Sequence, residues 1–231
     1  MSYHWDFTSP LGFLDLWTRG VGVTLALGLT VVCLGTLMAV PLVWALRCRF
    51  WSVRIAAQTY IHVFRSIPAL VLIGTVYFCL PMFTGYRIDP VSTAALALSI
   101  NLSPFAAECI RSAIQSVPSV QYESALSLGF TPTQTMRFVI LPQAAARALP
   151  PLAGQWVTSF KLTSLAATIS VPELWHATGQ VVVDTSRPIE ARLIGAALYV
   201  MMIAPFLLAV GWLERRSALR GYGGSPGGAV A

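Results

Sequence analysis

Between two strongly apolar regions the chain reads Tyr122-Glu123-Ser124-Ala125-Leu126-Ser127-Leu128-Gly129 and, after nine further residues, Val139-Ile140-Leu141-Pro142. This pattern is typical of two short helices joined by a turn. The apolar runs on either side are long enough to cross a bilayer. The chain is therefore expected to be a membrane protein that holds a folded helical loop outside the membrane.

The ends of the two short helices are marked by individual residues. Ser119 follows Pro118 and is a favourable N-cap for a first helix over about 120–128. Gly129 can adopt the positive φ of a helix C-terminus. Thr131 and Pro132 suit the N-cap and first position of a second helix. Such a loop fits a groove on another protein or lies flat on the lipid surface, and the residues alone leave both possibilities open.

Composition supports the membrane interpretation. Hydrophobic residues make up 56% of the 231 residues and charged residues 10%, against about 25% charged in soluble domains. The mean hydropathy is +0.70. Uncharged segments lie at 20–46, 66–86, 90–107 and 193–213, and a fifth at 148–171 is interrupted by Lys161 alone. The sequence predicts an all-α polytopic bundle of about five transmembrane helices, several of them kinked or broken by proline.

Basic residues predict the orientation of the bundle. If the segment after the first span is cytoplasmic, ten arginines lie inside, namely Arg47, Arg49, Arg54, Arg65, Arg111, Arg137, Arg147, Arg215, Arg216 and Arg220. Four lie outside, namely Arg19, Arg87, Arg187 and Arg192. This bias places the N-terminus outside and the C-terminus in the cytoplasm. The predicted parts are an extracytoplasmic segment 1–19, a transmembrane domain 20–216 and a disordered, glycine-rich cytoplasmic tail 217–231.

Motifs for metal binding and catalysis are missing from the sequence. The four cysteines form no C-x-x-C pair and have no spacing suited to a zinc site or a disulfide framework. The phosphate loop G-x-x-x-x-G-K-[ST], the nucleophile motif G-x-S-x-G and the metalloprotease motif H-E-x-x-H do not occur. We therefore expect no enzymatic activity, no metal and no cofactor in this chain, and an intramembrane hydrolase is disfavoured.

Polar residues within the apolar segments are candidates for a solute pathway, because ionisable groups in a membrane are costly. Lys161 is expected in the middle of its span, where it could meet a carboxylate of a solute or of a partner chain, or extend to the interface. Gln155, Ser159 and Thr163 are expected to form a polar stripe with it, or to hydrogen-bond between helices. Glu108 is expected to pair with Arg111 three residues later, or with Arg65.

The spacing of the loop resembles a family signature. Glu123-Ser124-Ala125, three residues, Gly129, nine residues and Val139-x-Leu141-Pro142 resemble the E-A-A-x(3)-G-x(9)-I-x-L-P signature of ABC importer permeases. Further segments resemble the polar amino acid permeases, of the histidine, glutamine, arginine or glutamate type: 20–24, 64–68, 107–111, 114–118, 139–144, 148–152, 163–165 and 171–174. The sequence departs from the family at Ser124, where alanine is usual, at 65–68 and 101–105, and at Leu162, where aspartate is common.

The resemblance implies a type I ABC importer permease that carries a polar amino acid across the cytoplasmic (inner) membrane. Its implied partners are a sister permease or a second copy of itself, separate ATP-binding subunits and an extracytoplasmic amino-acid-binding protein. The opine class and modified amino acids remain alternative cargoes, and a scaffold or sensor is the non-transport alternative. The residues implied in coupling to the ATPase, which would dock on the loop 123–142, are Glu123, Ser124, Ala125, Gly129, Leu141 and Pro142.

Overall fold

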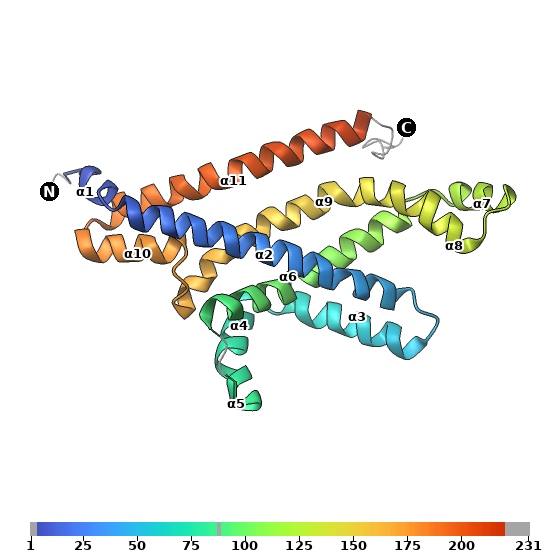
Figure 1. Cartoon of the computed structure of the whole chain (residues 1–231), viewed down its shortest axis with the longest axis horizontal. Coiled ribbons are helices and arrows are strands. Elements are labelled where there is room, and N and C mark those ends of the chain that lie inside the picture. The colour runs from blue at the N-terminus through green and yellow to red at the C-terminus, as the bar shows by residue number, and fades with distance from the viewer. Residues whose placement is uncertain (1–3, 87–88, 220–231) are drawn as a thin grey trace, which may run out of the picture.

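The computed structural model describes residues 4–86 and 89–219, and every regular element in these ranges is helical (Figure 1). The long α-helices are α2 (Leu14–Leu46), α3 (Trp51–Ser66), α6 (Pro90–Gln115), α9 (Leu141–Leu162), α10 (Leu174–Thr185) and α11 (Pro188–Leu219). The shorter α-helices are α1 (Thr8–Leu11), α4 (Ala69–Gly74), α5 (Leu80–Thr84), α7 (Ser119–Ser127) and α8 (Pro132–Gln134). Two π-helical segments, η1 (Thr75–Cys79) and η2 (Thr135–Ile140), and a 3-10 segment, η3 (Thr163–Ile169), complete the list.

The predicted all-α, multi-span class is confirmed. Three described helices, α2, α6 and α11, are long and apolar enough to cross a membrane. A fourth span is obtained if α3 and the segment 69–84 are counted together, although they are bent by 105°. The 22-residue α9 is long enough but less apolar. The predicted number of about five is reached when the bent pair and α9 are both included.

The segment 66–86 is long enough and apolar enough for one span, but it is broken at one of the prolines that were expected to kink or break the spans. Ile67 is extended, with φ −86° and ψ 124°, because the ring of Pro68 disfavours the helical conformation of the residue before it. The chain then continues through α4, η1 and α5 to Gly85, which ends α5 with φ +72°. Arg54 and Arg65, which the sequence placed in an inner loop, lie on helix α3 instead.

The core forms where α2 packs along α6 and α6 packs along α9. Glycines of α2 allow close approach to α6 and also to α9. A Cβ atom built on Gly35 would lie 2.8 Å from Cδ2 of Leu102 on α6, and one built on Gly28 would lie 2.3 Å from Cε1 of Phe160 on α9. Trp156 Nε1 also donates to Thr36 Oγ1 at 3.0 Å, which joins α9 to α2.

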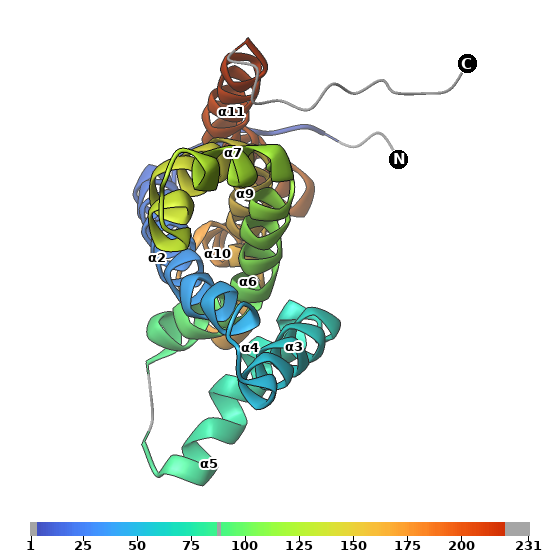
Figure 2. The same ribbon diagram turned by 90° about the vertical axis from the view of Figure 1, so that its right-hand side faces the viewer.

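The two ends of the bundle differ. In Figure 1, α1 and α10 lie at the end that holds the N-terminal residues, whereas α7 and α8 lie at the opposite end. Figure 2 shows α11 and the α3–α5 segment on opposite sides of the group formed by α2, α6 and α9. Helix α11 extends to Leu219, beyond the expected end of the transmembrane domain at 216, and the tail residues 220–231 lie outside the described residues.

Candidate functional site: the segment between α6 and α9

Helix α7 begins one residue earlier than the sequence predicted. Pro118 is the N-cap residue, with φ −57° and ψ 138°, and no side chain caps the helix. Ser119 is therefore the first helical residue and not the N-cap. Pro118 takes the cap position because its ring fixes φ near this value and its extended ψ ends the preceding segment.

The end of α7 and the start of α8 follow the sequence prediction. Gly129 has φ +87°, its N–H donates to the Leu126 carbonyl at 2.9 Å, and the Phe130 N–H donates to the Ala125 carbonyl at 3.1 Å. These two bonds form a Schellman motif. Thr131 Oγ1 then accepts from the Gln134 N–H, and Gln134 Oε1 accepts from the Thr131 N–H, in a capping box. The T-x-x-Q spacing carried this signal, although the sequence analysis used only Thr131 and Pro132.

The apolar side chains of α7 divide between two faces. Ala125 is only 3% exposed, and Tyr122 packs against a small cluster formed by Val117, Ile140 and Ala144. Leu128, by contrast, is 78% exposed. The apolar face predicted for α7 therefore supplies both the inner packing of the loop and part of its outer surface.

The outer surface of the segment carries a mixture of side chains. Val120, Leu126 and Phe138 are exposed apolar residues on this surface. Four residues of the implied coupling set are also exposed, namely Glu123, Ser124, Leu141 and Pro142. Gly129 belongs to the same surface, since a Cβ atom built there would meet no atom of the chain within 4 Å. The structure thus brings together the signature residues on one short loop, with Ala125 facing inward.

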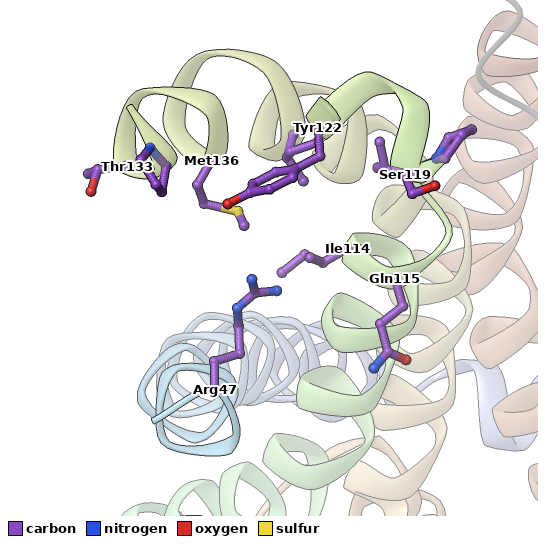
Figure 3. A pocket seen from close by; sticks show the side chains of 11 residues that line it. Arg47, Ile114, Gln115, Ser119, Tyr122, Thr133 and Met136 are labelled. Atoms are coloured by element: carbon purple, nitrogen blue, oxygen red, sulfur yellow. The ribbon is translucent and has the colours of Figure 1, made fainter. Parts of the chain in front are cut away.

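A cavity of about 560 Å³ lies under this loop. Figure 3 shows Arg47, at the end of α2, directed toward Tyr122 and Met136, with Ile114 and Gln115 of α6 on the adjoining wall. The loop is attached at the side of this cavity: Arg147 of α9 donates to the Ser116 carbonyl just after α6. The loop therefore touches the bundle along one side and spans a hollow on the other.

The predicted pathway residues do not form one stripe. Lys161 lies in the last turn of α9, which ends at Leu162 and is followed directly by the 3-10 helix η3. Lys161 is exposed and lines a largely apolar cavity with Tyr199 of α11. Ser159, two residues earlier, points to nearly the opposite side of the helix. The expected helical spacing with Lys161 was wrong.

The hydroxyl groups of the predicted stripe are used within α9 itself. Ser159 is buried and donates to the Gln155 carbonyl at 3.0 Å. Thr163 is buried and donates to the Phe160 carbonyl at 2.7 Å. Gln155 is half-buried. Both bonds are local, because serine and threonine hydroxyls readily bond to carbonyls of the preceding turn.

The predicted ion pair on α6 is confirmed. Arg111 Nε donates to Glu108 Oε2 at 3.0 Å, and its second guanidinium nitrogen donates to Glu108 Oε1. No group of three or more His, Cys, Asp or Glu side chains suited to a metal occurs within residues 4–86 and 89–219. The four cysteines are free thiols.

A polar group at the opposite end of the bundle was missed by the sequence analysis. The fully buried Glu173 caps α10 by accepting from the N–H groups of Trp175 at 2.8 Å and His176 at 2.7 Å. Tyr199 Oη donates to Glu173 Oε2 at 2.6 Å. Burial raises the pKa of the Glu173 carboxyl above its usual value, and the hydrogen bonds from Tyr199, Trp175 and His176 oppose this shift. Only tertiary structure brings Tyr199 to this carboxylate.

Comparison with known proteins supplies the family. Residues 20–219 match the family model described as "Binding-protein-dependent transport system inner membrane component". Glutamine transport system permease protein GlnP of Escherichia coli K12 is 32% identical over 94% of this chain and 98% of that protein. Octopine transport system permease protein OccM of Rhizobium meliloti is 33% identical over 91% of this chain and 94% of the OccM chain.

A solved structure agrees with these sequence relatives. The crystal structure of an amino acid ABC transporter with histidines matches with a TM-score of 0.88 and 32% identity, over 93% of this chain and 100% of that chain. The family model, the sequence relatives and the fold cover nearly the same residues. This chain therefore belongs to the family of inner membrane components of binding-protein-dependent transport systems.

Proposed function

We propose that this chain is the membrane-spanning permease of an ABC importer for a polar amino acid, and that the loop 123–142 docks on a separate ATP-binding subunit. The observation that carries this proposal is the form of the loop. Both helix ends at the turn are capped, and the side chains around Gly129 face away from the bundle. A rigid, exposed projection of this kind is suited to a groove on another protein.

The surface of α7 favours a protein partner over lipid. A helix that lies on a membrane separates its apolar face from its polar face. On α7, exposed Val120 and Leu126 alternate with exposed Gln121, Glu123 and Ser124. This mixed surface matches a protein interface, where an apolar centre is surrounded by polar groups.

The signature residues have distinct roles in this proposal. Glu123, Ser124 and Gly129 are exposed and would contact the ATP-binding subunit. Ala125 would act by its small size, because it is buried where α7 packs on the rest of the loop. Leu141 and Pro142 form the first turn of α9, so they would transmit a displacement of the loop to the bundle.

We infer the orientation from the distribution of arginines. Arg137 lies in η2 directly after α8, and Arg47 lines the cavity under the loop. Arg111 bonds to Gln115, which lines the same cavity, and Arg147 bonds to the Ser116 carbonyl beside it. Basic residues accumulate on the cytoplasmic side of membrane proteins. The loop would then face the cytoplasm, and α1 and α10 would face the extracytoplasmic binding protein.

Transport in this arrangement proceeds by alternating access. Closure of two ATP-binding subunits would move the docked loops, and the packed helices would convert that motion into opening toward the outside. The sequence relatives include a glutamine and an octopine permease. A polar amino acid is therefore the proposed cargo, and an opine is the second candidate.

Gly129→Asn tests the loop, and Gly85→Asn is its matched control. Both glycines have positive φ, at +87° and +72°, and open space where a Cβ atom would lie. Asparagine tolerates this backbone conformation better than most residues. The two substitutions therefore impose similar backbone strain, and only the first adds a side chain to the proposed docking surface.

Uptake of labelled amino acids is measured in cells that lack this chain and are complemented with each form. We expect both variants to reach wild-type membrane levels, and Gly129→Asn alone to lose uptake and co-purification of the ATP-binding subunit. A Gly129→Asn variant with reduced abundance and normal uptake per molecule would show that the glycine only ends a helix. If the wild type restores opine uptake and no amino-acid uptake, the proposed cargo is wrong.

A further inference from the structure

A second cavity, of about 390 Å³, lies between the end of α2, helix α3 and the last turns of α6. We call it the α3–α6 cavity. Its lining is rich in basic groups and contains a single carboxylate: the ionisable side chains are those of Arg47, His62, Arg65, Glu108 and Arg111. A cavity with three guanidinium groups and one carboxylate is suited to an anion.

The single carboxylate is already paired. Both oxygens of Glu108 accept hydrogen bonds from the Arg111 guanidinium, at 3.0 Å for Oε2 and Nε. The remaining nitrogen of Arg111 donates to Gln115 Oε1 at 2.9 Å. Glu108 and Arg111 thus balance each other, and the net positive charge of the cavity comes from Arg47 and Arg65.

Neither Arg47 nor Arg65 takes part in a side-chain hydrogen bond or ion pair within residues 4–86 and 89–219. The guanidinium carbon of Arg65 lies 5.2 Å from the centroid of the Phe105 ring. A cation–π contact of this kind restrains the position of the guanidinium group without using its N–H groups as donors to a carboxylate or carbonyl. Arg47 lies on the wall that this cavity shares with the one under the loop.

The surface beside the cavity is apolar and aromatic. Trp44, one turn before Arg47, is 71% exposed, and Trp51 at the start of α3 is 68% exposed. Leu37 and Val40 continue the exposed apolar surface along α2. Tryptophan and arginine together are typical of the boundary between hydrocarbon and lipid headgroups. The cavity therefore opens next to a surface that acyl chains can cover.

We propose that the α3–α6 cavity binds the phosphate of an anionic phospholipid, whose acyl chains lie along the exposed face of α2. A guanidinium group binds a phosphate through two parallel N–H bonds. Basic pockets between membrane helices are known sites for anionic headgroups. The adjoining apolar surface selects a lipid over a soluble phosphate, and the proposal does not depend on the cargo or on the ATP-binding partner.

Native mass spectrometry of the purified full-length chain in neutral detergent tests this site. The ligands are dioctanoyl phosphatidylglycerol, dioctanoyl phosphatidylcholine and inorganic phosphate. The test variant is Arg47→Gln/Arg65→Gln, and the matched control is Arg49→Gln/Arg54→Gln. The control removes the same charge from nearby exposed residues that do not line the cavity.

We expect saturable binding of phosphatidylglycerol that is tighter than binding of phosphatidylcholine. The test pair should weaken it about 30-fold, since each basic residue near an anionic headgroup contributes roughly fivefold. Arg47→Gln alone should weaken it about fivefold and leaves the Arg65–Phe105 contact intact, which keeps the test valid if the double variant unfolds. The control pair should leave the affinity unchanged.

Three results would overturn the proposal. Equal weakening by the two pairs would show general attraction to basic protein. Equal affinity for the zwitterionic lipid would show that the acyl chains bind without the phosphate. Displacement of the lipid by an equal concentration of inorganic phosphate would show a site for soluble anions.

Discussion

Gly28→Ala should separate α2 from α9. A Cβ atom at this position would lie 2.3 Å from Cε1 and 2.4 Å from Cδ1 of Phe160, whereas carbon atoms in contact are about 3.5–4.0 Å apart. Phe160 is only 2% exposed, and its ring lies 4.7 Å from that of Phe206 on α11. The buried ring must therefore shift against Phe206 to admit the added methyl group, or α2 and α9 must move apart.

The magnitude is obtained by comparison with Gly22→Ala. Gly22 lies on the same helix, and a Cβ atom there meets nothing within 4 Å. Both substitutions gain the roughly 0.5–1 kcal/mol by which alanine exceeds glycine in a helix, so this term cancels. Overpacking a core costs about 1–3 kcal/mol. Gly28→Ala should therefore unfold with a free energy about 1–3 kcal/mol lower than that of Gly22→Ala.

Equilibrium unfolding of the purified variants in mixed detergent micelles measures this difference. A second variant, Gly28→Ala/Phe160→Leu, should recover part of the loss, because the smaller side chain vacates the space that the methyl group needs. Equal unfolding free energies for the two alanine variants, or a double variant no more stable than Gly28→Ala, would refute the close contact between α2 and α9.

Three further predictions concern polar contacts. Thr131→Ala removes a capping-box hydroxyl and should destabilise the α7–α8 turn by about 1 kcal/mol. Trypsin should then cleave this loop faster than in the wild type. Thr133 is exposed, and Thr133→Ala should leave the cleavage rate unchanged. Trp156→Phe and Thr36→Val each break the 3.0 Å hydrogen bond between α9 and α2. A double-mutant cycle should give a coupling free energy of about 0.6 kcal/mol. A coupling of zero would contradict this contact. Burial raises the pKa of Glu173, so the folded state favours the neutral carboxyl. The contribution of this group to stability should therefore fall as pH rises from about 4.3, the ordinary pKa of a glutamate, through the higher pKa of the folded state. Thermal unfolding over this range should show a smaller pH dependence for Glu173→Gln, and an unchanged slope would contradict the assignment.

Local signals were predicted well from the sequence. Gly129, Thr131 and Pro132 mark a helix end and a helix start because their backbone conformations depend on adjacent residues alone. The Glu108–Arg111 pair was also found, since residues three apart on one helix are always close. Long apolar runs also identified α2, α6 and α11, because the length and hydropathy of a span can be read from consecutive residues.

Averages over a segment concealed other features. The run 66–86 is apolar throughout, so hydropathy alone does not locate the break, whereas the prolines indicated one and Pro68 holds Ile67 out of the helix. Arg54 and Arg65 made the sequence of α3 resemble a loop, although Ala57 and Ile61 provide a buried side. The end of α9 at Leu162 was hidden because the apolar sequence continues through η3.

Contacts between distant residues could not be obtained from spacing. Glu173 and Tyr199 are 26 residues apart and meet because α10 packs against α11. The Arg65–Phe105 contact joins α3 to α6 across a longer gap in the sequence. These pairs are set by tertiary packing, which a single sequence does not specify.

The uneven attachment of α11 has a thermodynamic consequence. Its first turns are held by α10, with buried Glu190 near Arg187 and the Asp6 N–H, whereas its most apolar 18-residue window is only 11% buried. Contacts with the rest of the described chain therefore contribute little free energy to holding this apolar stretch of α11 in place. In the proposed importer, lipids and neighbouring subunits would supply most of the contacts there, and together they would set the angle at which this helix leaves the bundle.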